Sequence, residues 1–203
     1  MEPAKTLAEF FGVDHLDLGP NINDKIVSST AHIIVDVQRE FCDQKYFRRG
    51  SDVTEAISNH IALNLVPQFR KAGLKTVFIY TVDFDDDYKK PNECCGGFYK
   101  VKPRPGDQLS YKTGLSAFRG TGLAARLKKS GIKNVIISGF NANACVKSTV
   151  ISALKEEFNV CVLRDGIAND RWNKGDINDH INDMKKQGAA FYPSDKVLKY
   201  LTR

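Results

Sequence analysis

Short apolar segments alternate with amphipathic ones along most of this chain, and this alternation limits the folds that it can adopt. Residues 32–37 are rich in β-branched side chains, and residues 51–71 then carry apolar side chains at helical spacing, at Ile57, Ile61, Leu65 and Phe69. Residues 75–80 form a second apolar segment. Strands that are apolar on both faces are typical of a parallel sheet covered by helices on both sides. The pattern predicts a βαβ unit at residues 31–80.

The alternation continues toward the C-terminus. Strands are predicted at residues 109–112, 134–138, 159–163 and 189–192, and helices at residues 123–129, 143–158, 177–186 and 194–201. A chain of 203 residues is long enough for one domain with a sizeable core. We therefore predict a three-layer α/β sandwich, in which a mostly parallel, roughly six-stranded Rossmann-like sheet is covered by helices on both faces.

Two segments stand outside this regular pattern. Residues 1–29 mix short apolar stretches with the turn formers Gly19, Pro20 and Asn21. They are predicted to be an N-terminal extension to a domain that spans residues 30–203. Residues 83–107 are acidic at first and then rich in Gly, Pro and Lys, which predicts a long loop of the kind that often carries function.

Composition excludes several classes of partner. The formal charge is +6, but the 30 Lys and Arg are scattered among 24 acidic residues, so we expect a solvated surface and no nucleic-acid partner. The apolar runs are too short to cross a bilayer, and the N-terminus lacks the basic-then-apolar pattern of a secretory signal. Five cysteines, an odd count in a chain of this length, favour reduced thiols. We expect a cytoplasmic protein without a membrane partner.

The sequence GFNANACVKST, residues 139–149, follows directly on the apolar run at residues 135–137. Asn143 is a favoured N-cap residue, which would place Cys145 in the first turn of a helix, where backbone N–H groups have no intrahelical partner. The helix dipole favours a thiolate at that position, and the free N–H groups can hold an oxyanion. The turn fits a nucleophilic Cys145 and a small buried core residue equally well.

Two further polar residues fall at predicted strand ends. In parallel sheets, ligands bind beyond the carboxyl ends of the strands. Asp36 ends the first strand, Lys112 ends the third, and Cys145 follows the fourth. A structural role in a loop is the alternative for Asp36, because a buried carboxylate needs a cation or a donor, and a single lysine is usually a surface residue. Together, an acid, a cation and a thiol make a nucleophile with a base and electrostatic support.

Three segments carry a resemblance to a known family. They are IVDVQREF at residues 34–41, Lys112 with SAF at residues 116–118, and GFNANACV at residues 139–146. They resemble the isochorismatase-like cysteine hydrolases, a superfamily that includes nicotinamidases, N-carbamoylsarcosine amidases and ureidoacrylate amidases. The resemblance extends from about Ala31 to the C-terminus and includes GAA at residues 188–190. It indicates the superfamily without singling out one member.

This resemblance implies roles for particular residues. Asp36, Lys112 and Cys145 would form a catalytic triad. A cis peptide bond between Phe140 and Asn141 would turn the N–H of Asn141 toward the oxyanion, beside the N–H of Cys145. The resemblance also implies a homo-oligomer, either a dimer or a tetramer.

Four aromatic residues are candidates for the substrate pocket: Phe41, Phe98, Phe140 and Trp172. Phe98 and Trp172 lie in loops that can reach the carboxyl edge of the sheet. Phe140 stands where the family usually has an aliphatic residue, and Ala142 stands where it usually has Thr, so both affect the shape of the pocket. Ordinary packing is the alternative for each aromatic residue.

No cofactor is expected. Nicotinamidases of this family hold a metal with an Asp and two His, whereas the corresponding stretch here, residues 80–88, contains no histidine. The usual ligands of zinc or iron are therefore missing. Asp83 is a weak candidate ligand, since carboxylates can bind magnesium or calcium, but an acidic run is more often a solvated loop. We expect no metal.

The function predicted from these residues is that of a cysteine hydrolase. It would cleave a C–N bond, of the amide or ureido type, in a small molecule through a thioester intermediate. Two alternatives stay open. Isochorismate hydrolysis breaks a vinyl ether, and Cys145 argues against it because relatives with that activity can lack the cysteine. A binding or scaffold protein that kept the fold without turnover is the alternative outside enzymes.

Overall fold

The computed structural model describes residues 6–11, 22–45, 49–82, 97–173 and 175–202. Within these residues six strands form one sheet, in the order β3-β2-β1-β4-β5-β6, and every neighbouring pair is parallel. The strands are β1 Thr30–Val35, β2 Lys75–Thr81, β3 Gln108–Lys112, β4 Asn134–Phe140, β5 Asn159–Ala168 and β6 Ala190–Tyr192. The order reverses direction at β1, so the chain has the topological switch point at which ligands bind in such sheets.

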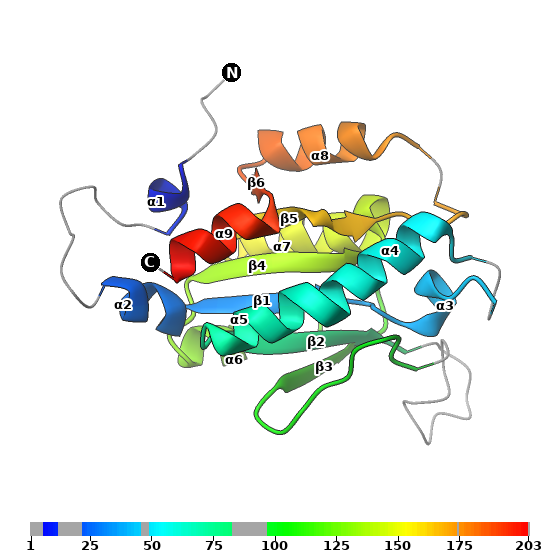
Figure 1. Ribbon diagram of the computed structural model, residues 1–203. Coiled ribbons are helices and arrows are strands. Elements are labelled where there is room, and N and C mark those ends of the chain that lie inside the picture. The colour runs from blue at the N-terminus through cyan, green and yellow to red at the C-terminus, as the bar shows by residue number, and fades with distance from the viewer. Residues whose placement is uncertain (1–5, 12–21, 46–48, 83–96, 174, 203) are drawn as a thin grey trace.

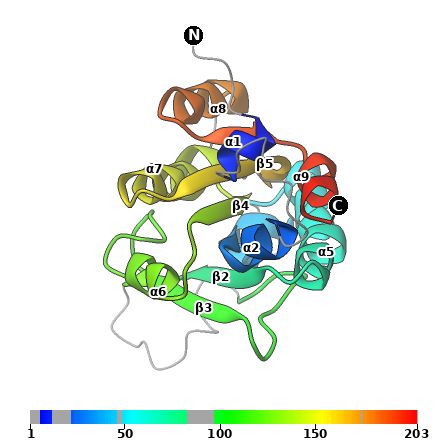
Figure 2. The ribbon, with the colours of Figure 1, turned by 90° about the vertical axis from the view of Figure 1, so that its left-hand side faces the viewer.

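Helices cover both faces of the sheet (Figure 1 and Figure 2). One face packs against α6 Leu123–Lys129, α7 Lys147–Lys155 and α8 Ile177–Lys186. The other packs against α1 Leu7–Phe10, α2 Ile22–Ser28, α4 Asp52–His60, α5 Val66–Lys71 and α9 Ser194–Leu201, and the short helix α3 Arg39–Cys42 follows β1. The predicted three-layer α/β sandwich with a six-stranded parallel sheet is confirmed.

Successive side chains of β1 point to opposite faces of the sheet, and because both faces are covered, the strand sequences are apolar throughout. Ile33 and Val35 point into the cluster under α6, α7 and α8, whereas Ile34 points into the cluster under α4, α5 and α9. All three side chains are buried. Each buried side chain of this size contributes roughly 1.5–3 kcal/mol relative to exposure. Both faces of β1 therefore stabilise the fold.

The predicted helix at residues 51–71 contains a wider turn. Its first turn has a capping box, in which Ser51 Oγ accepts from Thr54 N at 3.2 Å and Thr54 Oγ1 accepts from Ser51 N at 2.7 Å. A π-helical turn, η1 Ile61–Leu65, then separates α4 from α5. Pro67, the second residue of α5, has no N–H to donate to the preceding turn, which accounts for a local change of hydrogen-bond register there.

Several predicted boundaries shift near the carboxyl edge of the sheet. The predicted helix at residues 143–158 begins instead as a π-helical turn, η3 Ala142–Val146, and continues as α7 to Lys155. Strand β5 runs to Ala168 rather than ending at residue 163, after a register shift against β4 between Ile137 and Gly139. The longer β5 carries the chain to the end of β4, where Phe140 pairs with Ala168.

The described part of residues 1–29 packs on the domain. Leu7 and Phe10 of α1 are buried in the cluster that also contains α9, and the Phe11 ring stacks on Tyr200 with ring centroids 5.2 Å apart. The division of the chain at residue 29 stays a prediction. In the described part of the chain, no helix combines the length and the apolar character needed to span a membrane.

Candidate active site

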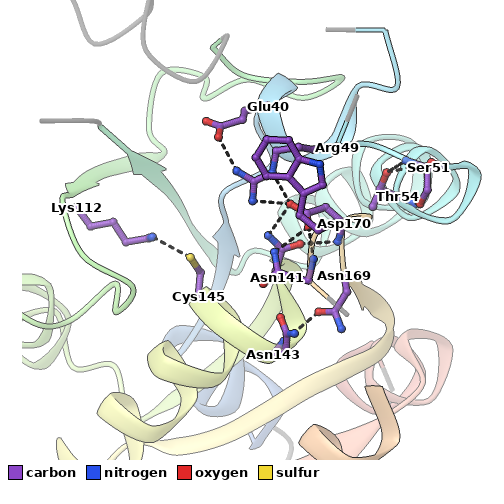
Figure 3. A network of polar contacts seen from close by, with 12 residues as sticks. Glu40, Arg49, Ser51, Thr54, Lys112, Asn141, Asn143, Cys145, Asn169 and Asp170 are labelled. Atoms are coloured by element: carbon purple, nitrogen blue, oxygen red, sulfur yellow. Dashed lines mark hydrogen bonds and ion pairs between the residues drawn. The ribbon is translucent and has the colours of Figure 1, made fainter. Parts of the chain in front are cut away.

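Three strand ends bring Asp36, Lys112 and Cys145 together. Asp36 follows β1, Lys112 is the last residue of β3, and Cys145 lies in η3 after β4. Lys112 Nζ is 2.8 Å from Asp36 Oδ2 and 3.4 Å from Cys145 Sγ. Figure 3 shows the lysine side chain reaching across to the sulfur. Residues far apart in the sequence thus form one cluster at the carboxyl edge of the sheet.

Asp36 occupies a turn that suits its residue type. Its φ is 50°, in the left-handed region, which Asp and Asn tolerate better than most residues. Its N–H still donates to the Ile79 carbonyl at 3.2 Å, and its own carbonyl accepts from Gln38 N at 2.8 Å. The chain therefore leaves the sheet at Asp36, and the carboxylate is left fully buried beside the end of β2.

The Lys112 ammonium is held from several sides. Nζ donates to Thr81 Oγ1 at 2.7 Å, to the Gly114 carbonyl at 3.0 Å and to Cys145 Sγ at 3.4 Å. The same nitrogen forms a close ion pair with Asp36 Oδ2 at 2.8 Å. The side chain is 1% exposed, so the alternative of a surface lysine is wrong.

Thr81 and Gln38 support this cluster, and sequence reasoning did not find their roles. Gln38 Nε2 donates to the Thr81 carbonyl at 3.1 Å, and Thr81 N donates to Gln38 Oε1 at 2.8 Å. This pair of bonds fixes the end of β2, from which the Thr81 hydroxyl meets Lys112. The available signal was the position of Gln38 inside the segment IVDVQREF, two residues after Asp36.

Burial sets the charge state of the cluster. Burial raises the pKa of Asp36, and the opposing charge of Lys112 offsets part of this rise. Burial and then the Asp36 charge raise the pKa of Cys145 to about 12, although Lys112 acts in the opposite direction. Burial alone would lower the pKa of Lys112, but Asp36 and Cys145 outweigh it and raise that pKa. The resting site therefore holds a thiol beside a buried ion pair.

This state differs from the sequence-based expectation for Cys145. Asn143 is not the N-cap: η3 begins at Ala142, its N-cap residue is Asn141, and Cys145 is the fourth residue of the turn. The sulfur is also close to a buried carboxylate, which the sequence of the turn could not reveal. For these two reasons the helix terminus does not by itself produce a thiolate.

The backbone before η3 is tightly fixed. Gly139 has φ of 125°, and a Cβ at this position would lie 2.0 Å from the Val35 carbonyl oxygen, so only glycine fits. The peptide bond between Phe140 and Asn141 is cis. The Asn141 carbonyl accepts from Ala144 N and from Val146 N, both at 3.0 Å. Among the described residues, the Asn141 N–H has no hydrogen-bond partner, and the Cys145 N–H has none outside η3.

A second polar network lies beside this turn (Figure 3). Arg49 Nε and Nη2 both contact Asp170 Oδ2, at 2.8 and 2.7 Å, and Arg49 Nη1 contacts Glu40 Oε1 at 2.6 Å. Asn141 Nδ2 donates to Asp170 Oδ2 at 3.2 Å. Nothing in the sequence singled out Arg49 or Asp170, because both lie in segments without a regular pattern.

Two of the four predicted pocket aromatics flank Arg49. The Phe41 and Trp172 rings lie on the Arg49 guanidinium, with centroids 4.8 and 4.7 Å from Cζ. Trp172 is 65% exposed, whereas Phe41 is buried. Phe140 is fully buried in the cluster under α4, α5 and α9, and it therefore presents no surface to a substrate.

Phe98 is bridged through its backbone to Gln38, and its ring packs against Tyr80 and Phe78, with centroid distances of 4.8 and 5.9 Å. It lines a hollow of about 570 Å³ whose walls include Lys100, Lys102 and Arg104 but none of the three clustered residues Asp36, Lys112 and Cys145. Asp83 lies outside the described residues. Within the described ranges, no group of three or more His, Cys, Asp and Glu side chains is arranged to hold a metal ion.

Comparisons with known proteins indicate the family of this chain. A family model described as the Isochorismatase domain matches residues 30–193. The N-carbamoylsarcosine amidase of Arthrobacter sp is 29% identical over 107 residues, which are 50% of this chain and only 38% of that relative's length. An uncharacterized isochorismatase family protein of Bacillus subtilis (strain 168), YrdC, is 32% identical over 141 residues, which are 68% of this chain and 73% of the relative. The crystal structure of N-carbamoylsarcosine amidase from Thermoplasma acidophilum has a TM-score of 0.69 and 25% identity, covering 82% of this chain and 97% of the other.

Proposed function

Because the chain belongs to the isochorismatase family, we propose that it is a cysteine hydrolase that cleaves an amide or ureido C–N bond of a small molecule. The observation that carries this proposal is the contact of Lys112 Nζ with both Asp36 Oδ2 and Cys145 Sγ, three groups that are buried together. The N-carbamoylsarcosine amidases among its relatives support a C–N bond as the target.

The reaction begins with proton transfer from Cys145 to Asp36. The thiol has a raised pKa and is protonated at rest, so the nucleophile forms as the sulfur attacks the carbonyl carbon. The raised pKa of Asp36 makes its carboxylate a better base, and Lys112 stabilises the negative charge on sulfur. A low-dielectric site strengthens both effects, because the charges are poorly screened.

The carbonyl oxygen becomes an oxyanion when the carbon–sulfur bond forms. The N–H groups of Asn141 and Cys145 are the proposed donors to it. Collapse of this intermediate breaks the C–N bond, and Asp36 gives its proton to the departing amine. Asp36 then takes a proton from a water molecule, and the hydroxide attacks the thioester carbonyl. The carbon–sulfur bond breaks, the carboxylic or carbamic acid leaves, and Asp36 returns the proton to sulfur. The net reaction is amide plus water to acid plus ammonia or amine.

A substrate panel tests this proposal. Wild type and Cys145→Ala are incubated with small primary amides, N-carbamoyl amino acids and ureido compounds, and release of ammonia or amine is measured. Turnover by wild type that disappears in Cys145→Ala supports the proposal. Turnover that survives the substitution contradicts the thiol mechanism. If wild type releases no ammonia or amine from any compound and the mass of Cys145 does not change, the enzyme proposal is contradicted and a binding role on the same fold is supported.

A further inference from the structure

Asp170 is the centre of the polar network beside the proposed oxyanion site. Its side chain is fully buried. Oδ2 receives the Arg49 guanidinium and the Asn141 amide, and Oδ1 receives Trp172 N at 3.1 Å, Asn173 N at 2.9 Å and Asn173 Nδ2 at 2.7 Å. A buried carboxylate with this many donors is a rigid hub, since moving it breaks several charge-assisted hydrogen bonds at once.

Asp170 forms hydrogen bonds with both the nitrogen and the oxygen of the Asn141 carboxamide. Asn141 Nδ2 donates to Asp170 Oδ2 at 3.2 Å, and the backbone N–H of Asp170 donates to Asn141 Oδ1 at 2.6 Å. Rotation of the Asn141 side chain would lose both bonds. The Asn141 carbonyl is fixed separately by the N–H groups of Ala144 and Val146. These contacts of the side chain and the carbonyl restrain Asn141 at the end of the peptide unit that carries its N–H.

The residue before Asp170 holds the same turn at a second place. Asn169 Oδ1 accepts from Asn143 N at 3.0 Å, and Figure 3 shows Asn169 and Asp170 side by side along the turn from Asn141 to Asn143. Both residues follow directly on Ala168, which pairs with Phe140 at the end of β4. The extension of β5 beyond residue 163 is what brings these two side chains to the turn.

Arg49 closes the network from the other side. Its charge is offset by Asp170 and Glu40, and its flat guanidinium is packed between the rings of Phe41 and Trp172. Its backbone carbonyl also accepts from Arg171 N at 2.8 Å. The guanidinium therefore holds the Asp170 carboxylate in place, and Arg49 acts as a clamp on Asp170.

We propose that Asp170, clamped by Arg49, is a positioning residue that aims the Asn141 N–H at the oxyanion of the proposed reaction. The inference rests on the proposed hydrolase function and adds a residue to it. Among the described residues, Asp170 has no hydrogen bond or ion pair with Cys145, Asp36 or Lys112. Its loss should therefore weaken the stabilisation of the oxyanion while leaving the reactivity of the thiol intact.

Two reactions of Cys145 separate these effects. Amide hydrolysis passes through a tetrahedral oxyanion, whereas alkylation by iodoacetamide displaces iodide at a saturated carbon and forms none. In alkylation the sulfur forms a bond to the CH₂ carbon, iodide leaves with the bonding electrons, and the thiol proton is lost to solvent. A variant that affects only the oxyanion donors should therefore lower the rate of hydrolysis and leave the rate of alkylation unchanged.

The test compares Asp170→Asn with wild type and with the control Asp107→Asn. Asp107 also pairs with an arginine, Arg70, and its side chain is 8% exposed, but in the described part of the chain it has no hydrogen bond or ion pair with Cys145 or the turn that carries it. For each protein, kcat and KM are measured on the best substrate of the panel, and the rate of alkylation at Cys145 is followed by peptide mass mapping. Removing an oxyanion donor costs about 100-fold to 1000-fold, so misdirecting one should lower kcat of Asp170→Asn by about 10-fold to 100-fold.

The expected result is this loss in kcat, with alkylation within threefold of wild type and with Asp107→Asn unchanged in both reactions. Equal losses in hydrolysis and alkylation would overturn the inference, since they would mean a general disturbance of the site. A kcat within threefold of wild type would overturn it as well, with the proposed hydrolase function left standing. Absence of hydrolysis in wild type itself would show that the proposed function has failed, and the inference with it.

A second variant keeps the inference testable if Asp170→Asn folds poorly. Asn141→Ala retains the backbone N–H but removes the carboxamide that Asp170 holds. It should show the same pattern, a fall in kcat with alkylation preserved. If Asp170 acts through Asn141, the double variant should be no slower than the slower single variant, because two changes to one contact do not add. Fully additive losses would contradict the inference.

Discussion

The Asp36 carboxylate and the Lys112 ammonium face each other at 2.8 Å, with 0% and 1% of their side chains exposed. Burial of two charges is costly and is offset only by close pairing and further hydrogen bonds. Thr81, Gly114 and Cys145 supply those bonds on the lysine side. The ion pair is therefore a property of the whole cluster, and removal of either member shifts the pKa of the Cys145 thiol.

Lys112→Met should destabilise the fold as well as abolish activity. It leaves the Asp36 carboxylate buried without its cation, and breaking a buried pair from one side typically costs about 3–5 kcal/mol. Urea unfolding at neutral pH measures this change in the free energy of unfolding. The double variant Asp36→Asn with Lys112→Met should recover part of the loss, because no lone charge remains. A single variant as stable as wild type would show that the pair is not buried as described.

Asp36→Asn should change the alkylation rate of Cys145 and the rate of hydrolysis in opposite directions. The Asp36 charge raises the pKa of Cys145 and Lys112 lowers it, so removal of the carboxylate should move that pKa below its present value of about 12. Alkylation of Cys145 at neutral pH should then become faster. Hydrolysis should fall by about 100-fold or more, because nothing protonates the departing amine. A pH profile of alkylation whose midpoint stays in place or moves upward would contradict this.

His32 should make the fold sensitive to acid. Burial, with a smaller contribution from Arg70, lowers the pKa of His32 from 6.5 to about 3. The unfolded state then binds more protons between these values, so the stabilising effect of a neutral His32 is present above pH 6.5 and is lost as the pH falls toward 3. From pH 6.5 to 5 the loss is about 2 kcal/mol, at about 1.4 kcal/mol per pH unit.

The control for this prediction is His32→Gln, whose amide can still pair with Ser138, the hydrogen-bond partner of His32 Nε2 at 2.8 Å. Urea unfolding at pH 7 and pH 5 is compared for the two proteins. The variant should lose less stability on acidification than wild type does. Equal losses would mean that His32 does not contribute to the acid response.

Gly139→Ala should be far more damaging than Gly131→Ala. Both glycines have positive φ, 125° and 74°, but a Cβ at residue 131 meets nothing within 4 Å, whereas one at residue 139 would overlap the backbone of Val35. The first change adds steric overlap to backbone strain of about 1–3 kcal/mol, and the second adds only strain. Thermal unfolding of the two variants provides the comparison. Similar losses would show that the contact between β1 and β4 can relax.

Much of this fold was predictable from hydrophobic periodicity alone. Strands such as residues 32–37 and 134–138 are apolar on both faces, and only a parallel sheet between two helical layers buries them. The same reasoning placed Asp36, Lys112 and Cys145 at neighbouring strand ends, and the structure brings them into contact. A short motif and a strand end are local features, so they can be found in the sequence.

The supporting network could not be predicted, because it depends on tertiary structure. The run Arg164-Asp165-Gly166 breaks the apolar pattern of β5 and indicates a strand end at residue 163, yet the strand continues to Ala168 after its register shift. Asp170 and Arg49 meet only because of that extension. The protonated state of Cys145 is likewise a result of burial beside Asp36, and neither the burial nor the neighbouring carboxylate is visible in the sequence of the turn.

The central claim is that the sulfur of Cys145 carries the acyl group during turnover. Acid quenching of wild type in the steady state with the best amide of the panel, followed by mass mapping of the peptide that contains Cys145, tests it directly. We predict a mass increase on Cys145 equal to the acyl group, lost on treatment with hydroxylamine as expected for a thioester. Sustained turnover with Cys145 unmodified throughout, together with full hydrolysis by Cys145→Ala, would contradict the account.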